Sequence, residues 1–106
     1  MPAAAMDIEA MQNAAGRAAA LMKALANPDR LMLLCQLSQR EMSVSELESA
    51  LGIRQPTLSQ QLTVLRDEAL VDTRRDGKYI YYRVRSAEAL AVLKALYRQF
   101  CAKEKP

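Results

Sequence analysis

The chain has 106 residues, 51% of them hydrophobic and 25% charged, which is the size and composition of one small globular domain. It has no histidine and only two cysteines, so it lacks an imidazole general base and cannot build a four-thiolate zinc site within one subunit. We therefore expect no enzyme, no cofactor and no metal site. A run of about 18 uncharged apolar residues is absent, and Asp7 and Glu9 interrupt the apolar N-terminus, which argues against a signal peptide. A cytoplasmic protein without a membrane partner is expected.

The net charge of +3 is concentrated in one stretch of the chain. Residues 54–85 hold seven basic and four acidic side chains, and the rest of the chain is neutral. Because phosphate neutralisation supplies most non-specific affinity for nucleic acid, this distribution is typical of a surface that meets a polyanion. A solvated face without a partner would carry the same charge, so the pattern alone leaves both interpretations open.

The first predicted helix covers about residues 7–25 and has a narrow apolar stripe. Its apolar residues recur at alternating spacings of three and four, which places them on one side of the helix. Such a stripe suits helix-on-helix packing, either on the chain's own core or against a second copy of the chain. The stripe consists of Ile8, Met11, Ala15, Ala18, Met22 and Leu25.

Two further helices are predicted from their start and stop signals. Asn27-Pro28-Asp29 offers a cap, a proline at the first helical position and an acid beside the helix dipole. The following LMLLCQL is apolar nearly all round, so this helix should be the central, buried one. A capping box is predicted at Ser45-Glu46-Leu47-Glu48, with Gly52 as the left-handed stop of that short helix.

A helix-turn-helix motif is predicted over about residues 45–69, with Pro56 opening its second helix. The buried side of this second helix carries Leu58, Leu62, Leu65 and Ala69. Gln, Ser and Thr dominate the other side, and Gln and Ser can present both a donor and an acceptor to base edges in the major groove. A helix whose polar side faces only water would have the same sequence pattern. The candidate DNA contacts are Arg54, Gln55, Thr57, Ser59, Gln60, Gln61 and Thr63.

A hairpin is predicted over about residues 71–85, with Asp76-Gly77 as its two-residue turn. This register places Arg75 opposite Lys78, two like charges that a DNA phosphate would relieve. The core face would carry Val71, Thr73, Ile80, Tyr82 and Val84. The outward face would carry Tyr79, Tyr81 and Arg83. The candidate phosphate contacts of the hairpin are Arg74, Arg75 and Lys78.

The last predicted helix runs from Ala87 to about Cys101. Its apolar residues repeat the spacing of the first helix, which makes it a second candidate for a dimer interface. These residues are Leu90, Leu93, Tyr97 and Phe100. A helix-turn-helix followed by a basic hairpin is a winged helix, so the expected fold is mainly α with a small β-hairpin, in one domain spanning residues 1–106.

In this order the elements resemble the ArsR/SmtB family of small dimeric winged-helix repressors over nearly the whole chain. The matching stretches are ALANPDRLMLLCQL, SVSELESALGIRQPTLSQQLTVLRDEALV and TRRDGKYIYYRV. The resemblance implies a homodimer formed by the helices of residues 7–25 and 87–101. It also implies that the helix of residues 55–69 contacts an inverted-repeat operator in double-stranded DNA, while the hairpin contacts the flanking backbone.

The cysteines of this chain depart from the metal-sensing members of that family. Those members carry a CVCDL-like motif where this chain has SVSEL at residues 43–47, and hydroxyl groups are poor ligands for soft metals. Cys35 and Cys101 are placed as in the sulfide- and persulfide-responsive subgroup, the BigR, SqrR and HlyU types, in which these positions form a disulfide or polysulfide bridge. The resemblance therefore implies a repressor that a persulfide, polysulfide or oxidant releases from DNA.

Several alternatives to this switch stay open. Free cysteine often packs as a small hydrophobe, so both thiols could be inert, as in an architectural protein that occupies DNA to exclude another regulator. Cys35 and Cys101 could instead bind a thiophilic metal or metalloid with a third donor from a partner subunit. If Cys101 is the reactive thiol, then Arg98, Lys103 and Lys105 could favour its thiolate.

Overall fold

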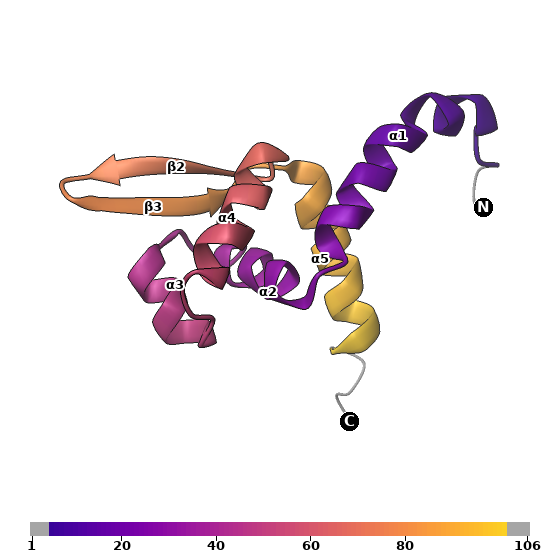
Figure 1. The fold of residues 1–106 in the computed structure, drawn as a ribbon. Helices are drawn as coiled ribbons and strands as arrows, with labels where there is room; N and C mark the ends of the chain where they lie inside the picture. The colour runs from indigo at the N-terminus through magenta and orange to yellow at the C-terminus, as the bar shows by residue number, and fades with distance from the viewer. Residues whose placement is uncertain (1–4, 102–106) are drawn as a thin grey trace.

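The structure is a computed structural model that describes residues 5–101, and it is a winged helix-turn-helix (Figure 1). The helices are α1 (Ile8–Leu25), α2 (Pro28–Leu37), α3 (Val44–Leu51), α4 (Thr57–Asp67) and α5 (Ala87–Phe100). The strands are β1 (Met42–Ser43), β2 (Val71–Asp76) and β3 (Tyr79–Val84), in the antiparallel order β1-β3-β2. The predicted fold class is confirmed. No helix in this part of the chain has both the length and the hydrophobicity that a bilayer span requires.

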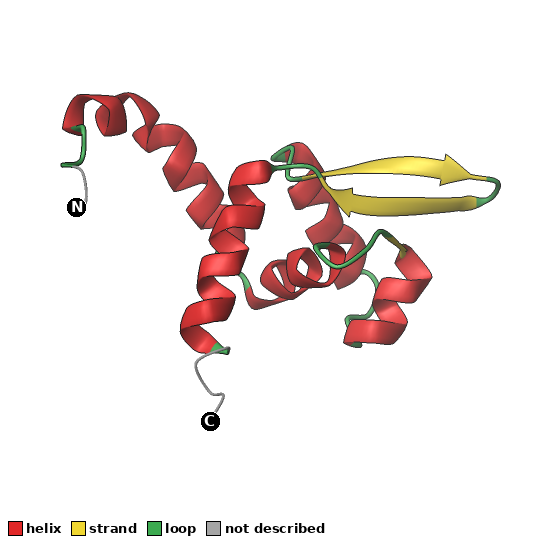
Figure 2. Cartoon of the chain, turned by 180° about the vertical axis from the view of Figure 1, so that it is seen from behind, coloured by secondary structure: helices red, strands yellow, loops and turns green. Residues whose placement is uncertain are grey.

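The elements divide between two ends of the molecule. The β2-β3 wing projects at one end, where α3 and α4 also lie, while α1 and α5 occupy the other end (Figure 1). The view from behind shows the same division, with α1 reaching away from the body of the molecule (Figure 2). The predicted DNA-contacting elements are thus separated from the predicted dimerisation helices.

The central helix α2 forms the middle of the core, as its nearly continuous apolar sequence predicts. Leu33, Leu34 and Leu37 of α2 are buried. They belong to one apolar cluster with Leu47 of α3 and with three leucines of α4. Fully burying a leucine side chain contributes about 1.5 to 3 kcal/mol to folding, so this cluster holds α3 and α4 in place.

The helix starts follow local hydrogen-bonding rules, although one predicted position is wrong. Asn27 caps α2 as expected, because its Oδ1 accepts a hydrogen bond from the Arg30 N–H at 3.0 Å. The capping box of α3 consists of Ser43 and Glu46, two residues before the predicted Ser45–Glu48 box. The shift arises because Met42 and Ser43 form β1 beside β3, a pairing that the sequence analysis missed, and the chain enters α3 directly from this strand.

Helix α4 is shorter at both ends than predicted. It begins at Thr57, with Pro56 as the cap residue, and it ends at Asp67. Ala69 was predicted on the buried side of the helix, but it is exposed and adopts a left-handed φ of 60°. The N–H of Leu70 donates to the Leu65 carbonyl at 2.9 Å, so the chain turns sharply and Leu70 enters the core in place of Ala69.

The hairpin turn lies at Gly77-Lys78 and not at the predicted Asp76-Gly77. Asp76 pairs with Tyr79, and Arg75 therefore lies opposite Ile80, so the predicted contact of Arg75 with Lys78 is wrong. Gly77 supplies the positive φ that the turn requires. The register differs from the predicted one by two residues, which leaves every side chain on its predicted face. Tyr82 and Val84 accordingly pack against the core.

Candidate functional site

The exposed side of α4 carries polar side chains that are ordered by hydrogen bonds. The Gln55 Oε1 accepts from the Ser59 N–H at 3.1 Å and from the Ser59 hydroxyl at 2.6 Å. The Thr63 hydroxyl donates to the Ser59 carbonyl at 2.9 Å. Gln55 thus serves one of the first N–H groups of α4, which Pro56 cannot cap with its own side chain. Together with the exposed Gln60, these residues form a polar face suited to the major groove.

Gln61, one of the predicted DNA contacts, is half-buried, unlike the exposed Gln60 beside it. The Gln61 Oε1 accepts a hydrogen bond from Arg30 at 2.9 Å. The same guanidinium donates to the carbonyls of Ala24 at 2.7 Å and Lys23 at 3.2 Å, at the end of α1. Arg30 thus joins the α1–α2 corner to α4. The role of Arg30 was not predicted from the sequence, although a cation in a nearly apolar helix must find acceptors near the core.

The wing cations differ in how far the chain itself neutralises them. Arg74 forms ion pairs with Glu41 and Asp76 and stacks on Tyr81, with its guanidinium carbon 4.8 Å from the ring centre. The hydrogen bond from Arg74 lowers the pKa of Glu41. Arg75 is exposed on the other face of β2, and Lys78 lies at the tip, over the Tyr79 ring. Among the predicted phosphate contacts, Arg75 and Lys78 are therefore better placed than Arg74.

The predicted dimer residues lie mostly on uncovered surface. Ile8, Met11 and Met22 of α1 and Tyr97 of α5 have exposed fractions between 45% and 60%. Ala15 and Ala18 are exposed as well. One of the two interpretations left open was that the whole α1 stripe packs on the chain's own core. These exposed side chains show that this interpretation is wrong. Only the end of α1 is buried, whereas Leu93 of α5 lies in the chain's own core and Leu90 is half-buried.

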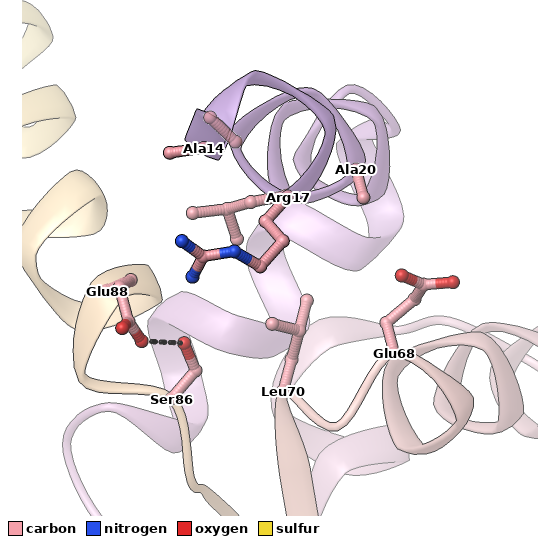
Figure 3. Close-up of a pocket in the computed structure, with 9 residues that line it drawn as sticks. Ala14, Arg17, Ala20, Glu68, Leu70, Ser86 and Glu88 are labelled. Carbon is pink, nitrogen blue, oxygen red and sulfur yellow. Dashed lines mark hydrogen bonds between the residues drawn. The ribbon is translucent and has the colours of Figure 1, made fainter. Parts of the chain in front are cut away.

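A cavity of about 540 Å³ lies between the middle of α1 and the body of the chain (Figure 3). Ala14 and Arg17 of α1 face Leu70 and the first turn of α5 across it, where the Ser86 hydroxyl donates to Glu88 at 3.3 Å. Helix α1 is thus anchored only near its C-terminal end. Its exposed stripe and this cavity leave the α1–α5 end open to a second surface.

Both cysteines lie at the junction of α2 and α5. Cys35 is half-buried on α2, while Cys101 is exposed at the end of α5, where its N–H donates to the Tyr97 carbonyl at 2.8 Å. Burial raises the pKa of the Cys35 thiol, and negative charge on Cys101 raises that pKa further. Cys35 lines a cavity with Tyr97, and Cys101 follows Tyr97 by one helical turn. The residues are far apart in sequence, and the fold brings both to this junction.

The surroundings of this thiol pair include a cavity of about 650 Å³ between α2 and α5. Cys35, Leu93, Tyr97 and Arg98 are among the residues that line it. The predicted cations Lys103 and Lys105 lie outside the described residues. Within residues 5–101, no group of three or more His, Cys, Asp or Glu side chains is arranged to hold a metal ion.

A helix-turn-helix with an ordered polar face, followed by a basic wing, defines this chain as a winged-helix DNA-binding protein. Residues 27–73 match the family described as bacterial regulatory protein, arsR family. The chain is 55% identical, over 92% of its length and 83% of the relative's, to the biofilm growth-associated repressor of Agrobacterium fabrum. It is 40% identical to the transcriptional activator HlyU of Vibrio cholerae, over 92% of its length and 91% of that protein's.

Solved structures agree with this assignment. The crystal structure of the transcriptional repressor BigR from Xylella fastidiosa matches with a TM-score of 0.87 and 51% identity, over 91% of this chain and 98% of that one. The chain belongs to the arsR family of bacterial regulatory proteins. It is a DNA-binding transcriptional regulator and not an enzyme, because its relatives are transcriptional regulators.

Proposed function

We propose that this regulator is a homodimeric, cytoplasmic repressor that binds an inverted-repeat operator in its reduced form. A persulfide or an oxidant then joins Cys35 to Cys101, which lowers operator affinity and derepresses the target genes. The observation that carries the proposal is the position of both thiols at the junction of α2 and α5, where Cys35 lines a cavity with Tyr97 and Cys101 follows Tyr97 by one helical turn. The BigR and Agrobacterium relatives are described as repressors, which fits this role.

The exposed α1 stripe supports the homodimer. A monomer with Ile8, Met11 and Met22 facing water leaves a continuous apolar strip, and such strips mark interaction surfaces. A two-fold dimer through this end would place two copies of α4 on the side away from the interface. Successive major grooves are roughly 34 Å apart, and a symmetric pair of α4 helices at that spacing suits an inverted repeat.

The exposures of the two thiols suggest the order of the chemical steps. The exposed Cys101 attacks first, because burial disfavours the thiolate of Cys35. Its thiolate attacks the terminal sulfur of R–S–SH, forming Cys101–S–SH and releasing RSH after proton uptake. Cys35 then attacks the inner sulfur and expels hydrosulfide. Two thiols and one persulfide thus give a disulfide, RSH and H₂S.

A longer bridge needs a second donor molecule. If both cysteines become persulfides, the terminal sulfur of one attacks the inner sulfur of the other and releases H₂S. Two thiols and two persulfides then give a trisulfide, two RSH and H₂S. A disulfide requires Cα atoms about 4.4 to 6.8 Å apart, and an added sulfur atom tolerates a wider gap.

The cross-link would act on DNA binding through α2. Helix α2 carries both Cys35 and Arg30, and Arg30 holds Gln61 on the inner side of α4. Joining α2 to α5 would therefore move or strain the element that positions α4. A coupling of about 1 to 3 kcal/mol between the thiol site and the DNA face corresponds to a change in affinity of about 5- to 150-fold.

The test is to treat reduced protein with glutathione persulfide and to follow the cross-link and operator release in the same samples. Peptide mapping by mass spectrometry should find Cys35 joined to Cys101 within one chain. Cys35→Ser and Cys101→Ser should bind the operator normally but should not release it on treatment. Normal release by either variant would reject the proposal.

Two other results would favour different functions. Operator release by a thiophilic metal ion that needs both cysteines, with no response to persulfide, would indicate a metal- or metalloid-responsive repressor. Undiminished operator affinity in a protein whose cross-link is complete would indicate an architectural or anti-silencing role with no sensing by the cysteines.

A further inference from the structure

The cavity between α2 and α5 has the size of a small-molecule site. Its volume of about 650 Å³ lies within the range of about 300 to 1,000 Å³ that is usual for ligand pockets. One wall is α2, which contributes Cys35, and the other is the face of α5 that ends at Cys101. Since Tyr97 lines the cavity and Cys101 follows it by one helical turn, the second thiol lies at the same end.

Positive charge lines this cavity without a compensating acid. Lys94 and Arg98 both line it from α5, one helical turn apart. None of its lining side chains in the described part of the chain is acidic, and neither cation pairs with a carboxylate of residues 5–101. Like charges at this spacing repel each other, so a bound anion would stabilise the pair.

The remaining lining residues make the site amphipathic. Leu90 and Leu93 provide an apolar surface beside the Cys35 thiol, and Gln36 of α2 and Gln39, just after this helix, offer amide groups. A ligand that fits has a sulfur end for the thiol side and a carboxylate end for the cations. A guanidinium can hold a carboxylate through two parallel hydrogen bonds, which fixes the orientation of such a ligand.

We propose that this cavity binds an organic persulfide that carries a carboxylate, with Lys94 and Arg98 holding the carboxylate. The inference rests on the proposed function and names the class of donor that the thiol pair accepts. Binding places the terminal sulfur of the donor near Cys101 and Cys35 before the first attack, and it raises the rate of the steps described above. An uncharged donor gains nothing from the two cations.

The experiment compares two matched pairs of reagents. Glutathione persulfide is compared with its analogue in which both carboxylates are primary amides, and iodoacetate is compared with iodoacetamide. The rate of cysteine modification is measured by quenched-flow mass spectrometry. We expect reduced protein to prefer the anionic persulfide over its amide analogue by about tenfold. Each alkylation rate is divided by the rate of the same reagent with free cysteine. After this correction, iodoacetate should also react faster than iodoacetamide.

The test variant is Lys94→Gln/Arg98→Gln, and the control is Arg17→Gln/Lys23→Gln. Both pairs remove one arginine and one lysine, so the net charge changes equally. The test variant should react with anionic and neutral reagents at similar relative rates, whereas the control should keep the preference. Operator binding by the reduced variants shows that each is folded.

The outcomes separate this inference from the function on which it depends. A test variant that keeps the preference for anions overturns the inference. An equal loss of rate with both members of a pair also overturns it, because the cations then act on the thiolates and not on the donor. If glutathione persulfide forms no cross-link in the unaltered protein, the proposed function itself fails. If the cross-link forms at a rate indifferent to donor charge, only the donor site is rejected.

Discussion

The two ends of the molecule differ in whether their exposed side chains have partners within the chain. At the end formed by α3, α4 and the wing, side chains such as Gln55 and Arg74 have partners within the chain. At the α1–α5 end, large apolar side chains such as Met22 and Phe100 remain exposed. The comparison indicates that one chain orders the DNA face by itself, whereas it leaves apolar surface uncovered at the opposite end.

One arginine connects these ends. The hydrogen bonds of Arg30 reach the last turn of α1 on one side and Gln61 of α4 on the other. Because α2 also carries Cys35, events at the α1–α5 end have a direct structural route to α4. Variants that remove a feature of one end, or this link, show whether the other end responds.

The largest expected effect comes from charging the α1 stripe. Ile8→Lys/Met22→Lys would place two ammonium groups in an apolar contact, where burying an unpaired charge is costly. We expect the dimer dissociation constant to rise about a thousandfold, or about 4 kcal/mol, in analytical ultracentrifugation. Asn13→Lys, on the opposite side of α1, is the control and should remain dimeric. A double variant that stays dimeric at micromolar concentration would show that the stripe is not the interface.

Removing the link should have the next largest effect. Arg30→Ala deletes three hydrogen bonds of a charged donor and removes the donor that serves the Ala24 carbonyl at the end of α1 and the Gln61 Oε1. The free energy of unfolding should fall by about 2 to 4 kcal/mol in urea titrations. Arg30→Lys keeps the charge but not the planar group that reaches both α1 and α4, so it should recover only part of the loss. Full recovery with lysine would mean that charge alone matters at this position.

A smaller effect should separate two neighbouring arginines of the wing. Arg75→Ala should weaken operator binding and reduce the salt dependence of the binding constant by about one phosphate contact. Arg74→Ala should change the salt dependence less, because Glu41 and Asp76 already neutralise much of its charge. Fluorescence anisotropy at several salt concentrations measures both. Equal slopes for the two variants would contradict the assignment of Arg75 as the phosphate contact.

The smallest effect concerns the pH dependence of stability. The hydrogen bond from Arg74 lowers the pKa of Glu41, so the folded state gains stability from the ionised carboxylate. This gain is complete above the ordinary glutamate pKa of about 4.3 and is lost as the pH falls through the lowered value. Urea midpoints across this range should therefore fall less steeply with acid in Glu41→Gln than in the unaltered protein. The same pH dependence of the urea midpoint in both proteins would show that ionised Glu41 does not stabilise the folded state.

The sequence predicts features that depend on local chemistry and misses features that depend on distant partners. The Asn27 cap and the Gly52 stop follow from neighbouring residues, and both are confirmed. The β1 strand, the Arg30–Gln61 bond and the Arg74–Glu41 pair each join residues about 30 to 40 positions apart. Periodicity contains no information on such pairs. The hairpin turn was misplaced because Asp76-Gly77 and Gly77-Lys78 both put the flexible glycine within the turn.

The most direct test of thiol control over DNA binding compares one protein sample in three states. An inverted-repeat operator, selected with the reduced protein, is titrated at one salt concentration with reduced protein, with protein cross-linked between Cys35 and Cys101, and with protein reduced again. We expect the cross-link to weaken binding by about 5- to 150-fold and reduction to restore it. Equal affinity in all three states would show that the thiols do not control the DNA face.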